Sequence, residues 1–151
     1  MSKAVIRAMR VDDMGETFRV RTSVTENALS LEQLEQMGIT PESVVASLAS
    51  RSRGWVAELD GRVVAFAIAD ADARSIFALF VAPGFEGRGL GSSLLELAVR
   101  WLQGERGGAI WLKTAPDTRA AAFYARRGFV VTGRESTGSL RLELRSSNDD
   151  R

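Results

Sequence analysis

The sequence predicts an α/β fold: an α+β mixed sheet of about seven strands, flanked by about four helices. Strand-like runs alternate with segments of helical period along the chain, which is typical of a sheet covered by helices. The length of 151 residues suits one domain, and 45% hydrophobic with 26% charged residues is a globular composition. We expect a single domain over residues 1–145 and a polar tail over 146–151.

The first fifty residues predict one strand and three helices, over residues 4–9, 13–24, 31–37 and 41–48. Asp12, Ser30 and Thr40 are expected to cap the three helices, because their side chains accept hydrogen bonds from a first helical turn. Gln33 gives Ser30 the spacing of a capping box, and Pro41 suits the first position of the third helix.

The remaining elements are expected as strands over 55–59, 62–71, 76–81, 109–114, 129–134 and 140–144, and helices over 92–103 and 118–127. Asp60-Gly61 is the strongest hairpin signal in the chain and separates the first two of these strands. The apolar run 76–81 predicts a strand covered on both faces. Gly104 and Gly128 are expected to end the two helices.

Two residue types are absent, and their absence excludes whole classes of chemistry. The chain has no Cys and no His. A thiolate nucleophile, a disulfide framework, a Ser-His triad and a His- or Cys-ligated metal are therefore excluded, and no metal site is predicted. Carboxylates, hydroxyls, Lys, Arg and backbone amides remain.

Charge and hydropathy predict neither a nucleic acid nor a membrane as a partner. The net charge is +1, and no stretch approaches the ~18 apolar residues of a membrane span. The first residues lack the apolar run of a secretory signal, so we expect a cytoplasmic protein.

The most informative segment is residues 81–93, VAPGFEGRGLGSS, which leaves a predicted strand and enters an amphipathic helix. Glycines let backbone N–H groups turn toward a ligand, and the helix start adds about half a positive charge. This combination predicts an anion site for a phosphate or pyrophosphate, with Arg88 adding a charged contact. The P-loop and dinucleotide spacings are both absent. An ordinary glycine-rich turn is the alternative.

A second segment follows about thirty residues later, DTRAAAFYARRGF over residues 117–129. A strand ending in V-x-P, a G-x-G-x-G loop opening a helix, another strand and a helix reading A-x-x-x-Y-x-x-x-G-F resemble the GNAT superfamily of acyl-CoA-dependent N-acyltransferases. The motifs cover residues 76 to 129, and the order of elements is similar over nearly the whole chain.

The resemblance implies acetyl-CoA as the cofactor and a sheet that splays between strands 76–81 and 109–114, with the thioester in the gap. It implies that a backbone N–H near Val81 faces the thioester oxygen and that Tyr124 protonates or hydrogen-bonds the departing thiolate. The alternative for Tyr124 is a core aromatic. The residues implied in cofactor binding are Leu79, Phe80, Val81, Glu86, Gly87, Arg88, Gly89, Leu90, Gly91, Ser92, Asp117, Tyr124 and Arg127.

The chain departs from the family pattern at three points. Glu86 stands where the loop usually has Arg or Gln, and Asp117 stands where the helix motif often has Asn. Many members carry a Glu on the strand matching 76–81, which has no carboxylate here. Glu26 and Glu58 are the candidate bases, and a surface charge is an equal alternative for each.

The resemblance implies an N-acetyltransferase that moves an acetyl group directly from acetyl-CoA to a primary amine of a small molecule or peptide. Without Cys or His, a covalent acetyl-enzyme is disfavoured. Residues 12–42 hold seven acids against two arginines, which favours a cationic amine, and solvated helix faces are the alternative explanation. The alternatives are a non-catalytic acyl-CoA-binding sensor or regulatory module, and a nucleotide-binding protein unrelated to CoA. The resemblance also allows a homodimer.

Overall fold

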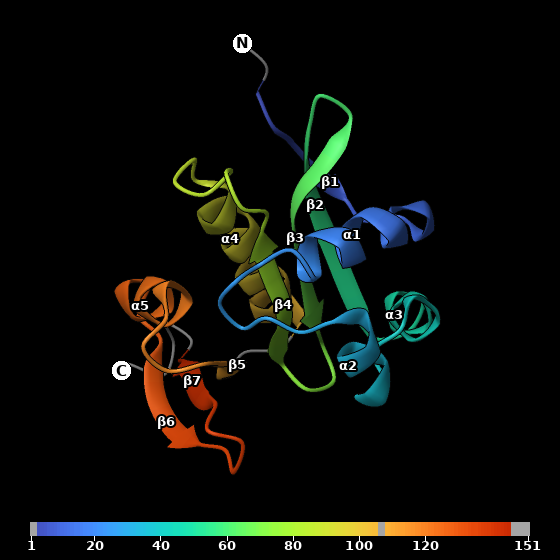
Figure 1. Ribbon diagram of the computed structural model, residues 1–151. Helices are drawn as coiled ribbons and strands as arrows, with labels where there is room; N and C mark the ends of the chain where they lie inside the picture. The colour runs from blue at the N-terminus through green and yellow to red at the C-terminus, as the bar shows by residue number, and fades with distance from the viewer. Residues whose placement is uncertain (1–2, 106–107, 146–151) are drawn as a thin grey trace.

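The computed structural model describes residues 3–105 and 108–145, and its centre is a seven-stranded mixed sheet in the order β1-β2-β3-β4-β5-β7-β6 (Figure 1). The strands are β1 (Val5–Ala8), β2 (Ser52–Leu59), β3 (Arg62–Asp70), β4 (Ser75–Val81), β5 (Ile110–Thr114), β6 (Val130–Arg134) and β7 (Leu140–Leu144). The helices are α1 (Met14–Arg21), α2 (Leu31–Gln36), α3 (Pro41–Leu48), α4 (Leu90–Glu105) and α5 (Arg119–Arg126). The predicted mixed sheet flanked by helices is confirmed. The predicted polar tail, 146–151, lies outside the described residues.

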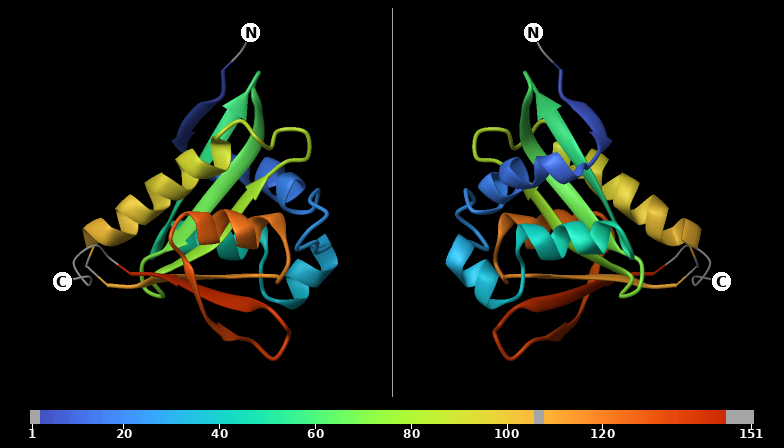
Figure 2. Two further views of the ribbon diagram at one scale, coloured as in Figure 1. Left: turned by 90° about the vertical axis from the view of Figure 1, so that its left-hand side faces the viewer. Right: turned by 90° about the vertical axis from the view of Figure 1, so that its right-hand side faces the viewer.

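Helices cover both faces of the sheet (Figure 2). One hydrophobic cluster joins α4 and α5 to the sheet and contains Leu94 and Leu102, both fully buried. The other cluster joins α1 and α3 to the opposite face through Val20 and Val44. Burying a leucine side chain contributes about 1.5–3 kcal/mol, so α4 is firmly fixed against the strands.

The predicted helix starts are mostly confirmed. The Ser30 and Thr40 hydroxyls accept hydrogen bonds from the backbone N–H groups of Gln33 and Ser43, and both are capping boxes. The cap expected at Asp12 is wrong. Asp12 lies inside a short 3-10 turn, Val11–Asp13, and α1 follows it directly.

Two other boundaries differ from expectation. Gly104 lies inside α4, which runs to Glu105 and begins at Leu90 rather than at 92.

Phe77 is 47% exposed although the strand around it was expected to be covered on both faces. The pairing of β3 with β4 skips Phe77, which forms a bulge beyond the point where β5 separates from β4.

The β2–β3 hairpin is confirmed by its backbone angles. Asp60 has φ +52° and Gly61 has φ +78°, and the flanking Leu59 and Arg62 are paired. Positive φ at both central residues is what a type I′ turn requires.

The sheet divides between β4 and β5. These strands run parallel, and in the described part of the chain they pair only at Ser75 and Trp111. β5 instead pairs along its whole length with β7, so the unit of β5, β6 and β7 turns away from β1 to β4 (Figure 1). The splay implied by the family resemblance is therefore present, and it opens toward the carboxyl ends of β4 and β5.

Within residues 3–105 and 108–145, none of the helices combines the length and the apolar character needed to cross a bilayer. The same residues contain no cluster of three acidic side chains that could hold a metal ion. The cytoplasmic location stays a prediction.

Candidate functional site

The edge of β4 presents backbone hydrogen-bonding groups to the gap. The Ala82 N–H donates to the Val64 carbonyl, and the register pairs Val81 with Ala65 and Leu79 with Ala67. Hydrogen-bonded and non-hydrogen-bonded pairs alternate along an antiparallel ladder. The N–H and C=O groups of Leu79 and Val81 therefore point away from β3, toward the gap, where they can pair with an extended ligand.

The glycine loop between β4 and α4 leaves open space beside its backbone. Gly84, Gly87 and Gly89 have φ values of +93°, +76° and +80°, a region that L side chains rarely adopt. A Cβ added at any of the three would meet nothing within 4 Å. The first N–H groups of α4 follow immediately and have no partner within the helix. An anion can therefore approach this backbone closely.

The start of α4 lies against both β4 and α5. A Cβ added at Gly91 would lie 3.9 Å from the Val81 Cγ2 and 3.7 Å from the Phe123 Cζ. Leu79, Val81 and Phe123 also pack against the same hydrophobic cluster as the buried Tyr124. The structure thus brings together four of the predicted features: the β4 edge, the glycine loop, the start of α4 and the tyrosine.

Tyr124 is 6% exposed and lies between two aromatic rings, with centroids 5.3 Å from Phe123 and 5.6 Å from Phe129. No described residue makes a hydrogen bond to its hydroxyl group. Burial raises the pKa of this hydroxyl well above its usual value, so the group is protonated at neutral pH. It is a proton donor that lacks a partner within the described chain.

Two arginines lie at the glycine loop, one within it and one after α5. The Arg127 guanidinium donates to the Ser92 hydroxyl in the first turn of α4 and lies 4.6 Å from the Phe123 ring centre. The Arg88 guanidinium lies 5.2 Å from the Phe85 ring centre. Both side chains belong to exposed residues, and they add positive charge next to the free amides of α4.

Glu86 is turned back onto its own loop. Its Oε1 accepts a 2.8 Å hydrogen bond from the Gly84 N–H. The backbone N–H groups of Glu86 itself and of Gly84 lower the pKa of this carboxyl. The Glu86 carboxylate, expected near the phosphates, is therefore held by backbone N–H groups at the β4 end of the loop.

The start of α5 is capped by a single side chain, and it is not that of Asp117. Thr118 is the cap, and its hydroxyl accepts from the Ala121 N–H. Asp117 precedes it as an exposed residue with φ +58° and is not the cap. The candidate base Glu26 lies here too, since its Oε1 accepts a 2.9 Å hydrogen bond from the Arg119 N–H.

The other candidate base, Glu58, lies apart from the gap. It is on β2, two strands from β4, and its carboxylate is held by the Arg7 guanidinium at 2.7 Å. Arg7 also bridges to Asp13 at 2.9 Å. Glu58 is thus part of an ion-pair network that joins β1, β2 and the turn before α1.

The segment between α1 and α2 spans the opening of the gap on the side opposite α4 (Figure 1). The Asn27 side chain accepts from the Ala115 N–H at 2.8 Å and donates to the Thr114 hydroxyl at 3.2 Å. Arg21 connects the same segment to β4, since it donates to the Asn27 carbonyl and stacks on Phe80. Sequence reasoning missed Arg21 and Asn27, because no local pattern marks contacts between such distant segments.

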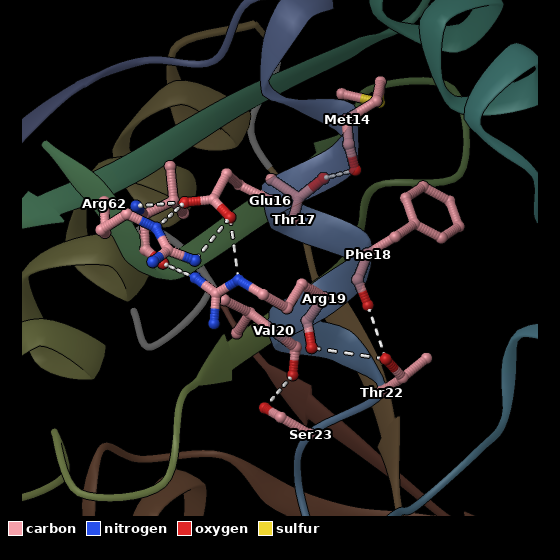
Figure 3. Close-up of polar contacts among 10 residues, drawn as sticks. Met14, Glu16, Thr17, Phe18, Arg19, Val20, Thr22, Ser23 and Arg62 are labelled. Atoms are coloured by element: carbon pink, nitrogen blue, oxygen red, sulfur yellow. Dashed lines mark hydrogen bonds and ion pairs between the residues drawn. The ribbon is translucent and has the colours of Figure 1, made fainter.

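Helix α1 is fixed to the sheet by the Glu16 carboxylate (Figure 3). It pairs with Arg62 on β3 and with Arg19 on α1, each at 2.8 Å. Arg19 in turn donates to the Val63 carbonyl at 2.7 Å. Together with the buried Val20, this network holds α1 on the sheet, and Arg21 is the last residue of that helix.

A family model for the acetyltransferase (GNAT) family matches residues 13–129 of this chain. The chain belongs to the GNAT family. Members of this family use acetyl-CoA, so the cofactor expected from the sequence is confirmed. Comparison with curated protein sequences found no significant match.

Solved structures share the GNAT fold over nearly the whole chain. The PaiA N-acetyltransferase of Thermoplasma acidophilum, in complex with coenzyme A, is 16% identical with a TM-score of 0.80, covering 95% of this chain and 99% of that one. A GCN5-related N-acetyltransferase of Rhodopseudomonas palustris is 22% identical with a TM-score of 0.77, covering 97% and 98%. The ribosomal-protein-S18-alanine N-acetyltransferase of Escherichia coli is 18% identical with a TM-score of 0.72, covering 94% and 93%. At these identities the likeness shows the fold alone.

Proposed function

We propose that this GNAT protein is an N-acetyltransferase that moves an acetyl group from acetyl-CoA directly to a primary amine of a small molecule or peptide. One observation carries the proposal. The backbone groups of Leu79 and Val81 face a gap in the sheet whose neighbouring loop and helix start leave open space and free amides.

The residues around this gap fit acetyl-CoA, which supplies an acetyl group activated as a thioester. The free amides from Gly87 to Ser92 suit a diphosphate, and Arg88 and Arg127 add charge-assisted contacts. The edge of β4 at Leu79 and Val81 suits the amide-containing arm of the cofactor, which can pair as a strand does. Phe80 contributes neither group: its backbone faces β3 and its ring packs with the cluster on the α1 side.

Two groups of the chain suit the chemical step. The Val81 N–H faces the gap and can stabilise negative charge on a carbonyl oxygen, a contact typically worth a few kcal/mol. The Tyr124 hydroxyl is protonated and lacks a partner among the described residues, so it can donate to a departing thiolate. We propose both roles, that of the Val81 N–H and that of the Tyr124 hydroxyl.

The acceptor amine must lose a proton before or during attack, since an alkyl ammonium has a pKa of about 10. Glu26 is the better placed of the two candidate carboxylates, because it lies in the segment that Asn27 attaches to the end of β5. Glu58 is bound to Arg7, two strands away from β4. We propose that the proton leaves through Glu26 or through water.

One observation favours the second candidate function, a non-catalytic acyl-CoA-binding sensor or regulatory module. Both candidate carboxylates already accept hydrogen bonds within the chain, Glu26 from the Arg119 N–H and Glu58 from Arg7. A sensor keeps the cofactor site and lacks a working base.

Thiol release from acetyl-CoA, measured over a panel of amines, separates the two functions. The panel contains polyamines, aminoglycosides, amino acids and peptide N-termini, each with a control lacking amine. We expect amine-dependent release of CoA and a matching mass increase of one acceptor. Calorimetric binding of CoA without release for any amine favours the sensor, and binding of ATP or NAD in place of CoA contradicts both functions.

A further inference from the structure

One guanidinium group stands at the wall of the gap on the side opposite α4. The Arg21 Cζ lies 4.1 Å from the centre of the Phe80 ring. Its Nη1 donates a 3.0 Å hydrogen bond to the carbonyl of Asn27, whose side chain is bound at the end of β5. Arg21 therefore lies between β4 and a segment attached to β5, where an acceptor amine would approach.

This cation has no carboxylate partner in the described part of the chain. Six of the described arginines form ion pairs with carboxylates, and Arg21 is among those that do not, although it is partly buried: the six are Arg7, Arg19, Arg51, Arg62, Arg100 and Arg141. A guanidinium carries five N–H donors and stays charged at physiological pH. A partly buried cation that uses one of these donors on a neutral carbonyl is poorly satisfied, and an anion from outside the chain would satisfy it.

We propose that Arg21 binds a carboxylate of the acceptor, so that the substrate is an amine that carries a carboxylate close to its nitrogen. This inference rests on the proposed function. The planar guanidinium matches a carboxylate through two parallel hydrogen bonds, and the Phe80 ring holds it in one plane. Free amino acids and peptides with an acidic first residue share this chemistry.

The acidic residues of the α1 region do not oppose this assignment. The Asp13 carboxylate is paired with Arg7, and Glu16 is paired with Arg19 and Arg62. The excess of acids over residues 12–42, which favours a cationic amine, is thus partly neutralised by neighbouring arginines. Arg21 is the cation at the wall of the gap, and Glu26 in the same segment accepts its hydrogen bond from the Arg119 N–H.

The same contact would assist the reaction. A positive charge near an ammonium group lowers the pKa of that group. By pairing with the carboxylate, Arg21 also cancels the negative charge that would hold the proton on the amine. Both effects increase the neutral fraction of the acceptor at a site where the candidate base Glu26 is already hydrogen-bonded to backbone.

The decisive experiment compares kcat/KM for amino acids and for their carboxamides, with thiol release as the readout. We expect the wild-type protein to prefer the carboxylate at least about tenfold, as one charge-assisted contact would give. Arg21→Gln should abolish this preference, because kcat/KM falls much more for the carboxylate than for the carboxamide. Arg100→Gln, which removes a 73% exposed cation on α4, should keep the full preference. Dipeptides with and without an acidic first residue distinguish the free amino acid from the peptide.

A binding measurement keeps the inference separate from the proposed function. N-acetyl amino acids and their carboxamides are titrated by calorimetry into the wild-type and Arg21→Gln proteins, each saturated with CoA. Tighter binding of the carboxylate form that disappears in Arg21→Gln supports the inference. Equal binding of the two forms, or equal loss of both in the variant, overturns it. Failure of thiol release with every amine contradicts the proposed function alone.

Discussion

Removing the buried hydroxyl of one residue, Tyr124, distinguishes a catalytic role of this side chain from a purely structural one. A buried hydroxyl without a partner costs about 1–3 kcal/mol. Because no described residue bonds it, Tyr124→Phe should leave the free energy of unfolding unchanged or raise it by up to about 1 kcal/mol. Turnover should fall about 100-fold, as expected when a general acid is removed. Urea unfolding and thiol-release assays measure the two effects.

Affinity for acetyl-CoA is the control for this variant. Calorimetry should give a similar dissociation constant for Tyr124→Phe and wild type, since the cofactor contacts assigned to the glycine loop are unaltered. Normal turnover combined with lower stability would instead identify Tyr124 as a core residue only.

Gly89 tests the assignment of the anion site. It has φ +80° and open space beside it, so Gly89→Glu places strain, bulk and negative charge where the phosphates are expected. We expect at least about tenfold weaker CoA binding by calorimetry. Gly38→Glu is the matched control, because Gly38 also has φ +80° and open space but follows α2. Equal CoA affinity in both variants would show that the loop is misassigned.

The two sides of the site differ in how far a sequence can predict them. The glycines of residues 84–91 and the tyrosine of residues 117–129 lie in contiguous motifs, and contiguous motifs can be read. Asn27 and Thr114 are 87 residues apart in the sequence, and Arg21 contacts Phe80 from 59 residues away. Their contacts depend on where α1 sits on the sheet, which no local pattern specifies.

At the scale of an element, α1 depends on Glu16 for its attachment to β3. The guanidinium groups of Arg62 and Arg19 lower the pKa of the Glu16 carboxyl from its ordinary 4.5 to about 2. A depressed pKa stabilises the folded protein above about pH 4.5, and this contribution is lost as the pH falls toward 2. Glu16→Gln should lower the free energy of unfolding by about 1 kcal/mol at pH 7, and the difference should vanish near pH 2.

The matched control is Glu96→Gln on α4. Glu96 pairs with Arg100 four residues later, and both side chains are more than 60% exposed. Exposed helical pairs contribute about 0.3–0.5 kcal/mol, so this variant should stay close to wild type over the whole pH range. Parallel pH profiles for the two variants would contradict the attachment of α1 by Glu16.

Element ends depend on tertiary packing as well as on local signals. The caps at Ser30 and Thr40 are predictable because a side chain bonds the backbone three residues later. The expected cap at Asp12 fails because Asp13, the next acid, binds Arg7 and the Arg10 N–H and so shifts the helix start to Met14. Gly104 stays within α4, since a glycine only permits a helix to end.

For the molecule as a whole, the spacing of hydrophobic residues along the sequence predicts which segments are strands but not which strands pair. The division between β4 and β5 was implied only by the family resemblance. β5 keeps β7 as its partner on the other edge from Ile110 to Thr114, so β5, β6 and β7 separate from β4 as one unit. The gap therefore lies between a strand in the middle of the chain and a unit built from its last three strands.

This division predicts that CoA stabilises the protein by filling the gap between the two parts of the sheet. At a CoA concentration 100 times the dissociation constant, linkage adds about 2.7 kcal/mol to the free energy of unfolding. For a chain of this size, we expect the Tm to rise by about 5–10 °C. Scanning calorimetry with and without CoA measures the shift, with NAD at equal concentration as the control ligand.

Hydrogen exchange locates the same effect within the sheet. The amides of Leu79 and Val81 point toward the gap and should gain protection when CoA binds. The amide of Ala82 already donates to Val64 in β3 and should change little, which makes it the internal control. Gly89→Glu should lose the rise in Tm and the protection together, because both depend on the phosphate contacts. Protection at Ala82 equal to that at Val81 would indicate general stiffening of the sheet and would contradict a ligand paired with the edge of β4.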